Sequence, residues 1–172
     1  MATAAVAFAQ LANECEAEGL TQHNAERLGK ELAKAFSVKT DEVGILRLEK
    51  QNLVFCYPTK LHDVGSIPLN TSTSVAVRTA NTKRAEVINN FAQIKHTSIF
   101  EAVELASSAG VDKHMHVIQK LMSAPVLGAA GTLGVIQVSR KGTSAPAAGS
   151  DFTANDLQKL VAIATQLAKC FK

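Results

Sequence analysis

An uninterrupted apolar segment near the C-terminus places the strongest constraint on the fold of this chain. Residues 133–136 read Leu-Gly-Val-Ile, without the polar alternation of a half-buried strand. Because successive side chains of a strand point to opposite faces of a sheet, both faces of such a strand need cover. The segment therefore predicts a central strand in a sheet that lies between helices.

The length and composition are those of one folded domain. The chain has 172 residues, of which 47% are hydrophobic and 19% are charged. This length suffices for one sizeable core but is short for two domains of usual size. The apolar fraction can offset the conformational entropy that is lost on folding. We therefore expect residues 1–172 to form a single globular α+β domain.

Charge and hydropathy argue against two classes of partner. The formal net charge is +3, and the 18 Lys and Arg residues are scattered, with only short pairs such as Lys83-Arg84. Nucleic-acid-binding proteins usually concentrate their basic residues along one face. No stretch of the sequence reaches the roughly 18 apolar residues that a membrane-spanning helix needs. We expect neither a nucleic acid nor a membrane as partner.

The cysteines indicate a reducing compartment. Cys15, Cys56 and Cys170 lie far apart in the sequence and form no C-x-x-C motif. Such cysteines are typical of reduced thiols in the cytosol. The N-terminal segment 1–11 is apolar, but it has no Lys or Arg at its start, unlike a secretory signal. We therefore expect an amphipathic helix there, in a cytoplasmic protein.

Helical periodicity marks both ends of the chain. Apolar residues recur every three or four positions in residues 1–37, with a break at residues 19–21, which predicts two N-terminal helices. Thr153, with Asp156 three residues later, caps a helix that is expected to extend over residues 153–172. One stripe of that helix is apolar and consists of Leu157, Leu160, Val161, Ala164, Leu167, Ala168 and Phe171.

Residues 43–140 are expected to form the sheet. β-Branched and aromatic residues bounded by turn residues mark its predicted strands, which cover residues 43–48, 53–57, 66–69, 85–88, 117–127 and 133–138. Pro125 is expected at a sheet edge or a bulge, because proline cannot donate a hydrogen bond to a neighbouring strand. The segment Gly128-Ala129-Ala130-Gly131 suits a hairpin turn between the last two strands.

The C-terminal segments together resemble the last part of GAF domains. They are Pro125–Leu127, Leu133–Val138, Asp151-Phe152-Thr153 and Asp156–Ala164. In that family a Gly-Val-rich hairpin strand is followed by a loop, an Asp/Glu-Phe-Thr/Ser cap and a helix. The expected order of the earlier elements, two helices and then a hairpin, extends the resemblance to the whole chain.

The resemblance implies a GAF-like (profilin-like) α+β fold. In such domains the helices from both chain ends pack together on one face of a central antiparallel sheet. Smaller helices and loops on the other face enclose a ligand pocket. Members bind cyclic nucleotides, bilins, haem, amino acids or other small molecules, and many dimerise and relay a signal. A shared fold does not identify the ligand, and the sequence names no cofactor.

The hallmarks of three GAF branches are missing from the sequence. The nearest fragment to the Asn-Lys-x-x-Phe-x-x-x-Asp-Glu pattern of cyclic-nucleotide phosphodiesterases is Asn89-Asn90-Phe91, which lacks the acidic end. A bilin needs a cysteine in the middle third, and none lies between Cys56 and Cys170. Reduction of free methionine sulfoxide needs closely placed cysteines near the pocket, whereas Cys15 and Cys170 fall on predicted terminal helices.

The middle segment, residues 65–116, is expected to form the pocket. It holds the only concentration of chemically versatile side chains, and loops held by a rigid sheet usually supply ligand contacts. A short helix is expected over residues 72–79. A capping box of Ser98 and Glu101 predicts another helix, whose first N–H groups would favour an anionic ligand. The candidate ligand-binding residues are Arg78, Asn90, Phe91, His96, Ser98, Glu101 and His114.

Each candidate also has a purely structural interpretation. Arg78 can form an ion pair as readily as it can hold an anion, and Phe91 suits a core position. His96, His114 and His116 match no recurrent zinc spacing, so local hydrogen bonds are favoured over a metal. The sequence contains no nucleophile motif, phosphate loop or dinucleotide motif. We therefore expect a protein that is not an enzyme.

Two main hypotheses of function follow. In the first, the chain is a sensory or regulatory domain that binds a small molecule and signals through a homodimer of its terminal helices. In the second, it is a dimerising interaction module without a ligand, and a thiol-dependent reductase is the third alternative. The expected interface residues are Phe8, Leu11, Leu160, Leu167 and Phe171. The structural alternative is that the terminal helices cover the chain's own sheet.

Overall fold

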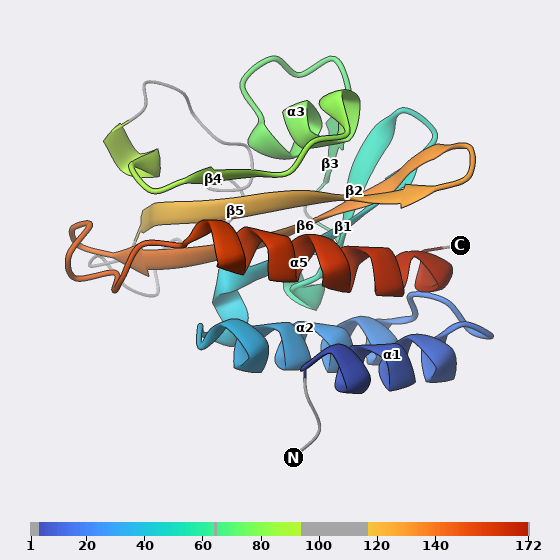
Figure 1. The fold of residues 1–172 in the computed structure, drawn as a ribbon. Coiled ribbons are helices and arrows are strands. Elements are labelled where there is room, and N and C mark those ends of the chain that lie inside the picture. The colour runs from blue at the N-terminus through green and yellow to red at the C-terminus, as the bar shows by residue number, and fades with distance from the viewer. Residues whose placement is uncertain (1–3, 64, 94–116, 172) are drawn as a thin grey trace.

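A six-stranded sheet with helices on both faces organises the protein (Figure 1). The computed structural model describes residues 4–63, 65–93 and 117–171. The strands follow the order β3-β2-β1-β6-β5-β4, and each neighbouring pair is antiparallel. The predicted α+β architecture with a central antiparallel sheet is therefore confirmed.

The strands lie where the sequence pattern predicts them, with small shifts at their ends. They are β1 (Val43–Glu49), β2 (Asn52–Tyr57), β3 (Ser66–Pro68), β4 (Glu86–Ile88), β5 (Val117–Gly128) and β6 (Gly131–Gly142). The hairpin between β5 and β6 closes where Gly128 pairs with Gly131, as expected. β1 and β2 form the other long hairpin, and Leu48 pairs with Leu53 near its turn.

The apolar segment that begins at Leu133 forms the centre of the sheet. Strand β6 lies between β1 and β5, and its residues from Gly134 to Ser139 are buried. Val135 and Ile136 belong to different hydrophobic clusters, because they point to opposite faces. Pro125 pairs with Val135 beyond the short stretch where β4 covers β5, so the predicted edge position of Pro125 is also confirmed.

Three of the described helices cover one face of the sheet. Helices α2 (Gln22–Phe36) and α5 (Ala154–Leu167) pack on the strands, and α1 (Ala4–Cys15) packs on α5 and α2 (Figure 1). The predicted cap of α5 is present, since the Thr153 hydroxyl accepts from Asp156 N at 3.1 Å. None of the helices in the described part of the chain combines the length and apolar character that a membrane crossing requires.

Helix α3 (Val75–Thr82) lies on the opposite face (Figure 1). It begins later than the predicted span 72–79, because Ser74 provides the N-cap and accepts a hydrogen bond from Val77 N at 3.2 Å. Single 3-10 turns follow several elements: η1 (Thr40–Glu42), η2 (Thr59–Leu61), η3 (Phe91–Gln93) and η4 (Ala168–Cys170). The helix predicted to begin at Ser98 lies outside the described residues.

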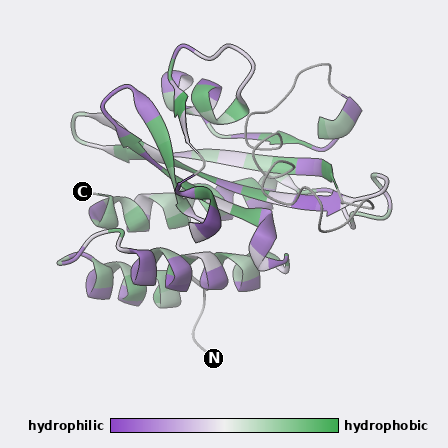
Figure 2. Ribbon diagram, turned by 180° about the vertical axis from the view of Figure 1, so that it is seen from behind, coloured by the Kyte–Doolittle hydropathy of each residue, from purple (hydrophilic) through white to green (hydrophobic). Residues whose placement is uncertain are grey.

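Two hydrophobic clusters fill the space on either side of the sheet. The larger one joins α1, α2 and α5 to the strands through residues such as Phe8, Leu28, Ile136 and Leu160. The smaller one joins α3 and Phe91 to the other face. In Figure 2 the helices below the sheet alternate between hydrophilic and hydrophobic residues along their length, as amphipathic helices do.

Two glycines mark the closest approaches between elements. A Cβ atom at Gly29 of α2 would lie 2.5 Å from atoms of the Tyr57 ring, which packs directly on the helix backbone. A Cβ atom at Gly134 of β6 would meet the Leu46 carbonyl oxygen and would lie 2.6 Å from the Phe171 ring. Any side chain at either position must therefore displace a packed neighbour.

We expect Gly29→Ala to lower the free energy of unfolding by about 1–3 kcal/mol, because the new methyl group collides with the Tyr57 ring. In an exposed helix the same change adds roughly 1 kcal/mol of stability, so the sign of the effect is diagnostic. Urea unfolding followed by circular dichroism measures it. Lys30→Ala, at the exposed neighbouring position, is the control and should stay within about 0.5 kcal/mol of the wild type. A Gly29→Ala chain as stable as the wild type would contradict this packing.

Candidate functional site

The structure places Arg78, the strongest candidate for an anionic ligand, in an ion pair. Its Nε and Nη2 atoms donate to Glu86 Oε1 at 2.9 and 2.7 Å. The pair joins α3 to β4 and is partly exposed, with 52% of the Arg78 side chain open to solvent. The observed contact of Arg78 is thus the structural alternative that the sequence left open.

The other predicted ligand residues divide into two groups. Asn90 is exposed, and Phe91 is buried in the smaller hydrophobic cluster, where it fills a core position. Neither residue lines the cavity described below, and neither does Arg78. The remaining candidates lie outside the described residues: His96, Ser98, Glu101 and His114.

A buried polar chain crosses the sheet face beneath α3. The hydroxyl groups of Thr79 and Ser123 are 2.7 Å apart, and Gln137 Nε2 donates to Ser123 Oγ at 3.2 Å. All three residues are almost completely buried. Gln137 Oε1 has no hydrogen-bond partner among the described groups. This face therefore offers one buried acceptor that a donor could still satisfy.

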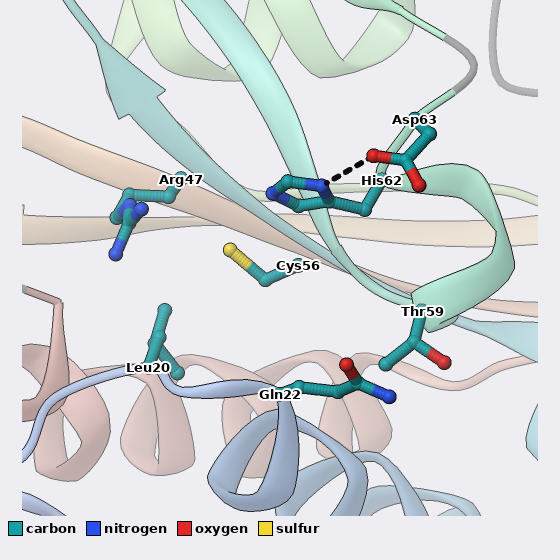
Figure 3. A pocket seen from close by; sticks show the side chains of 7 residues that line it. All are labelled: Leu20, Gln22, Arg47, Cys56, Thr59, His62 and Asp63. Carbon is teal, nitrogen blue, oxygen red and sulfur yellow. Dashed lines mark hydrogen bonds and ion pairs between the residues drawn. The ribbon is translucent and has the colours of Figure 1, made fainter.

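A cavity of about 230 Å³ opens elsewhere, between the start of α2, the β1–β2 hairpin and the turn η2 (Figure 3). In Figure 3 the Cys56 sulfur points into the space between the other lining side chains. The lining residues come from three separate parts of the chain and are Leu20, Gln22, Arg47, Cys56, Thr59, His62 and Asp63. We refer to this space as the α2 cavity.

Strand geometry brings Arg47 and Cys56 into the α2 cavity. Arg47 lies two residues after Ile45 on β1, so it points to the same, helix-covered face of the sheet. Cys56 of β2 belongs to the hydrophobic cluster on that face. Leu20 and Gln22 flank Thr21, whose hydroxyl caps α2 by accepting from Asn24 N at 3.1 Å.

Charges of both signs surround the α2 cavity. Arg47 Nε donates to Glu49 Oε1 at 3.0 Å, and 27% of the Arg47 side chain remains exposed. His62 Nδ1 lies 3.2 Å from Asp63 Oδ1 at the exposed side. The guanidinium group can therefore reach a bound molecule while it keeps its own carboxylate partner.

The Cys56 thiol is a poor nucleophile in this setting. Burial raises the pKa of Cys56, and the nearby positive charge of Arg47 only partly opposes this effect. The thiol is therefore protonated at neutral pH, whereas the reactive form of cysteine is the thiolate. No three His, Cys, Asp or Glu side chains gather as a metal site in the described part of the chain. The arrangement suits non-covalent binding of a small polar molecule.

The sequence contains one signal for this cavity, a charged residue within an apolar strand. Strand β1 reads Val-Gly-Ile-Leu-Arg-Leu-Glu, so a charged residue occupies a position on the face that the helices cover. Charged side chains on a covered face need a partner or an opening to solvent. Gln22, His62 and Asp63 gave no comparable signal, because residues at helix starts and in turns are polar in most proteins.

The other two cysteines meet, although they stand at opposite ends of the sequence. Cys15 ends α1 and Cys170 ends η4, and the Cys170 thiol donates to the Ala12 carbonyl oxygen in the last turn of α1 at 3.6 Å. Burial, with the neighbouring Cys15 adding to the effect, raises the pKa of Cys170 to about 11. Neither thiol lines the α2 cavity. Distance along the sequence gave no sign that these two residues come close in the fold, and all three cysteines are free thiols.

Most of the expected dimer-interface residues lie in the core of the chain itself. Phe8, Leu160, Leu167 and Phe171 are at most 4% exposed, and Leu11 is half-buried against the same cluster. Their apolar stripes cover the chain's own sheet and helices, which is the structural alternative. These four buried side chains are not available to a second chain in this structure, which corrects the expected interface.

Comparison with solved structures identifies the architecture. The chain is similar to the GAF domain of a phosphoenolpyruvate-protein phosphotransferase from Acinetobacter, with a TM-score of 0.66, 15% identity and coverage of 99% of this chain and 94% of that one. The GAF domain of a two-component sensor histidine kinase from Bacillus halodurans gives a TM-score of 0.59, with 16% identity and 88% and 94% coverage. This chain has the GAF-domain fold.

A third similar structure and two negative results complete the comparison. The reduced form of fRMsr from Staphylococcus aureus gives a TM-score of 0.56 at 17% identity, with 96% of this chain and 95% of that one covered. No family model matches the sequence, and no curated protein matches it. These three structures share little sequence with this chain. Their likeness therefore shows the fold and not a shared function.

We expect Cys56 to react with the thiol reagent DTNB at least about tenfold more slowly than free cysteine at neutral pH, because its thiol is buried and protonated. Comparing the wild type with Cys56→Ser isolates the contribution of this thiol. The same measurement in guanidinium chloride should expose all three thiols, so it gives the total number that can react. A fast native phase that Cys56→Ser removes would instead show an activated thiol in the cavity.

Proposed function

We propose that this chain is a cytoplasmic regulatory domain of the GAF type that binds a small polar molecule in the α2 cavity and catalyses no reaction. The observation that carries the proposal is the Arg47 guanidinium, which opens into a cavity between core elements. The fold supports it, since one similar structure belongs to a sensor histidine kinase. The protonated Cys56 thiol favours binding over chemistry.

The size of the α2 cavity limits the class of ligand. Sites for drug-sized ligands usually measure about 300–1,000 Å³, and this cavity measures about 230 Å³. A haem or a bilin is too large for it. Arg47 would hold a carboxylate or phosphate, and Leu20 with the Cys56 thiol would contact an apolar part. We infer a ligand of the size of an amino acid or a small dicarboxylate.

Helix α2 provides a route by which binding would be relayed. Thr59 Oγ1, in the turn that lines the cavity, donates to Glu26 Oε1 of α2 at 3.4 Å. The next residue, Arg27, forms an ion pair with Glu14 of α1. A ligand that shifts η2 against α2 would therefore act on the packing of α1. This coupling requires that the ligand bind two arrangements of α2 with different affinity.

We expect a thermal-shift screen of amino acids, dicarboxylates and sugar phosphates to find compounds that stabilise the wild type. Arg47→Gln should weaken the best of them at least about tenfold, because it removes the charged donor. Arg84→Gln, an exposed arginine that does not line the cavity, is the matched control and should bind as the wild type does. Equal affinity of Arg47→Gln and wild type would reject the α2 cavity as the site.

The second part of the proposal is signalling through a homodimer of the terminal helices. Because four of the expected interface residues are buried in the chain's own core, a dimer would use the outward sides of α1 and α5. Among the described residues the exposed large apolar side chains are Val6 at 56%, Leu127 at 43% and Val161 at 41%. Val6 lies on α1 and Val161 on α5, two helices that pack against each other. Apolar side chains on two neighbouring helices support an interface there.

Light scattering tests the dimer. We expect the wild type to dimerise at micromolar concentration and the double variant Val6→Asp/Val161→Asp to be monomeric, because each aspartate would bury a charge in the interface. Leu127→Asp changes an equally exposed side chain at the β5–β6 hairpin and should remain dimeric. A wild type that stays monomeric at every concentration would reject this part of the proposal. A dimer without any ligand response would favour the interaction-module alternative.

The thiol-dependent reductase remains the least supported alternative. The likeness to fRMsr concerns the fold, and the α2 cavity contains a single thiol, Cys56, whose pKa is raised by burial. A reductase that forms a disulfide needs a second cysteine within reach of the first. The paired thiols, Cys15 and Cys170, do not line this cavity.

A further inference from the structure

The two chain ends meet at a pair of cysteine thiols sealed inside the protein. Cys15, at the end of α1, and Cys170, in η4, are each 0% exposed and belong to the same buried cluster. Cys170 Sγ also donates to the Ala12 carbonyl oxygen of α1 at 3.6 Å. Both cysteines are free thiols. Cys170 therefore lies against the last turn of α1, which ends at Cys15.

Helix α1 is held to the C-terminal elements by non-covalent contacts, since Cys15 and Cys170 are free thiols. Gln166 Nε2 donates to the Ala5 carbonyl oxygen at 3.1 Å, and Lys169 Nζ hydrogen-bonds Asn13. Lys169 also lies 3.9 Å from Glu16 at the surface. Exposed polar contacts of this kind stabilise a protein weakly. A covalent bond between the two sulfurs would change how firmly α1 is held.

We propose that Cys15 and Cys170 form a redox modification site, in which a low-molecular-weight disulfide oxidises the pair and joins α1 covalently to the C-terminal turn. One thiol, as its thiolate, attacks glutathione disulfide and releases one glutathione. The second thiol displaces the other glutathione and closes the protein disulfide. Two protons and two electrons pass from the cysteine pair to the two glutathione molecules.

The position of α1 gives an oxidant access to this sealed site. Helix α1 packs on α5, α2 and η4 as the outer helix of its layer (Figure 1). Terminal helices open locally at less cost than central strands. Lifting the end of α1 would expose both thiols together, and reclosing would return them to contact. Cys56 takes no part, because it faces the α2 cavity on the β1–β2 hairpin.

The test of this site needs no ligand, so its outcome can be told apart from that of the proposed function. The purified full chain is incubated with glutathione disulfide, its free thiols are alkylated, and the intact mass is measured. We expect the loss of two hydrogen atoms, one alkylated cysteine, and a cross-linked peptide that contains Cys15 and Cys170. Dithiothreitol should reverse the change. The oxidised chain should melt about 5 °C or more above the reduced chain, because the bond closes a long loop.

Two variants make the result specific. Cys56→Ser keeps the pair and should still form the intramolecular disulfide, whereas Cys15→Ser should form none. Circular dichroism verifies that both variants fold, and Cys170→Ser replaces Cys15→Ser if the latter does not. A disulfide that includes Cys56, a cross-link between two chains, a persistent glutathione adduct, or three free thiols after oxidation would overturn the proposal. So would a melting temperature that falls on oxidation, because the native pair would then not accommodate the bond.

Discussion

The absence of a side chain at Gly134 is the constraint on which the arrangement of the whole helix layer depends. This residue lies in the central strand, and the space that its Cβ atom would take is filled by the Leu46 carbonyl oxygen and the Phe171 ring. The ring can therefore approach the backbone of the central strand closely. Phe171 directly follows η4, and Cys170 in this turn contacts α1. Helix α1 in turn packs against α2 and α5. A larger residue at position 134 would disturb each of these contacts in turn.

The same place in the sheet explains why a cavity forms where it does. Arg47 is the partner of Gly134 in the ladder between β1 and β6. Beyond it, the helix-covered face of the β1–β2 hairpin meets the start of α2 rather than the middle of a helix. A helix start presents a loop and short polar side chains, which pack less completely than an apolar stripe. The long side chain of Arg47 keeps its charged end at the remaining opening, with Glu49 beside it.

The sequence predicted the elements whose signals are local. The cap at Thr153 and Asp156 marks the start of α5, and the apolar segment after Leu133 marks the central strand. Helix α3 begins three residues later than expected, because Ser74 caps it. The α2 cavity could not be predicted, because Leu20, Arg47 and His62 are brought together only by the pairing of strands and the docking of a helix. Periodicity assigns a side chain to a face, but it does not show where the cover on that face ends.

The meeting of the two chain ends also has a consequence for the order of events during synthesis. Strand β1 pairs with β6, and α1 packs against α5 and η4. Both early elements therefore reach their final contacts only after these later elements have been synthesised. On a ribosome, the first helix therefore emerges long before its packing partners exist. Its apolar side, with Phe8 and Ala12, stays uncovered by its final neighbours until α5 and η4 have also been made. Contacts between such distant residues also slow folding, since the long intervening loop must close first. The arrangement that buries helix α1 thus makes it depend on residues that are synthesised after the whole sheet.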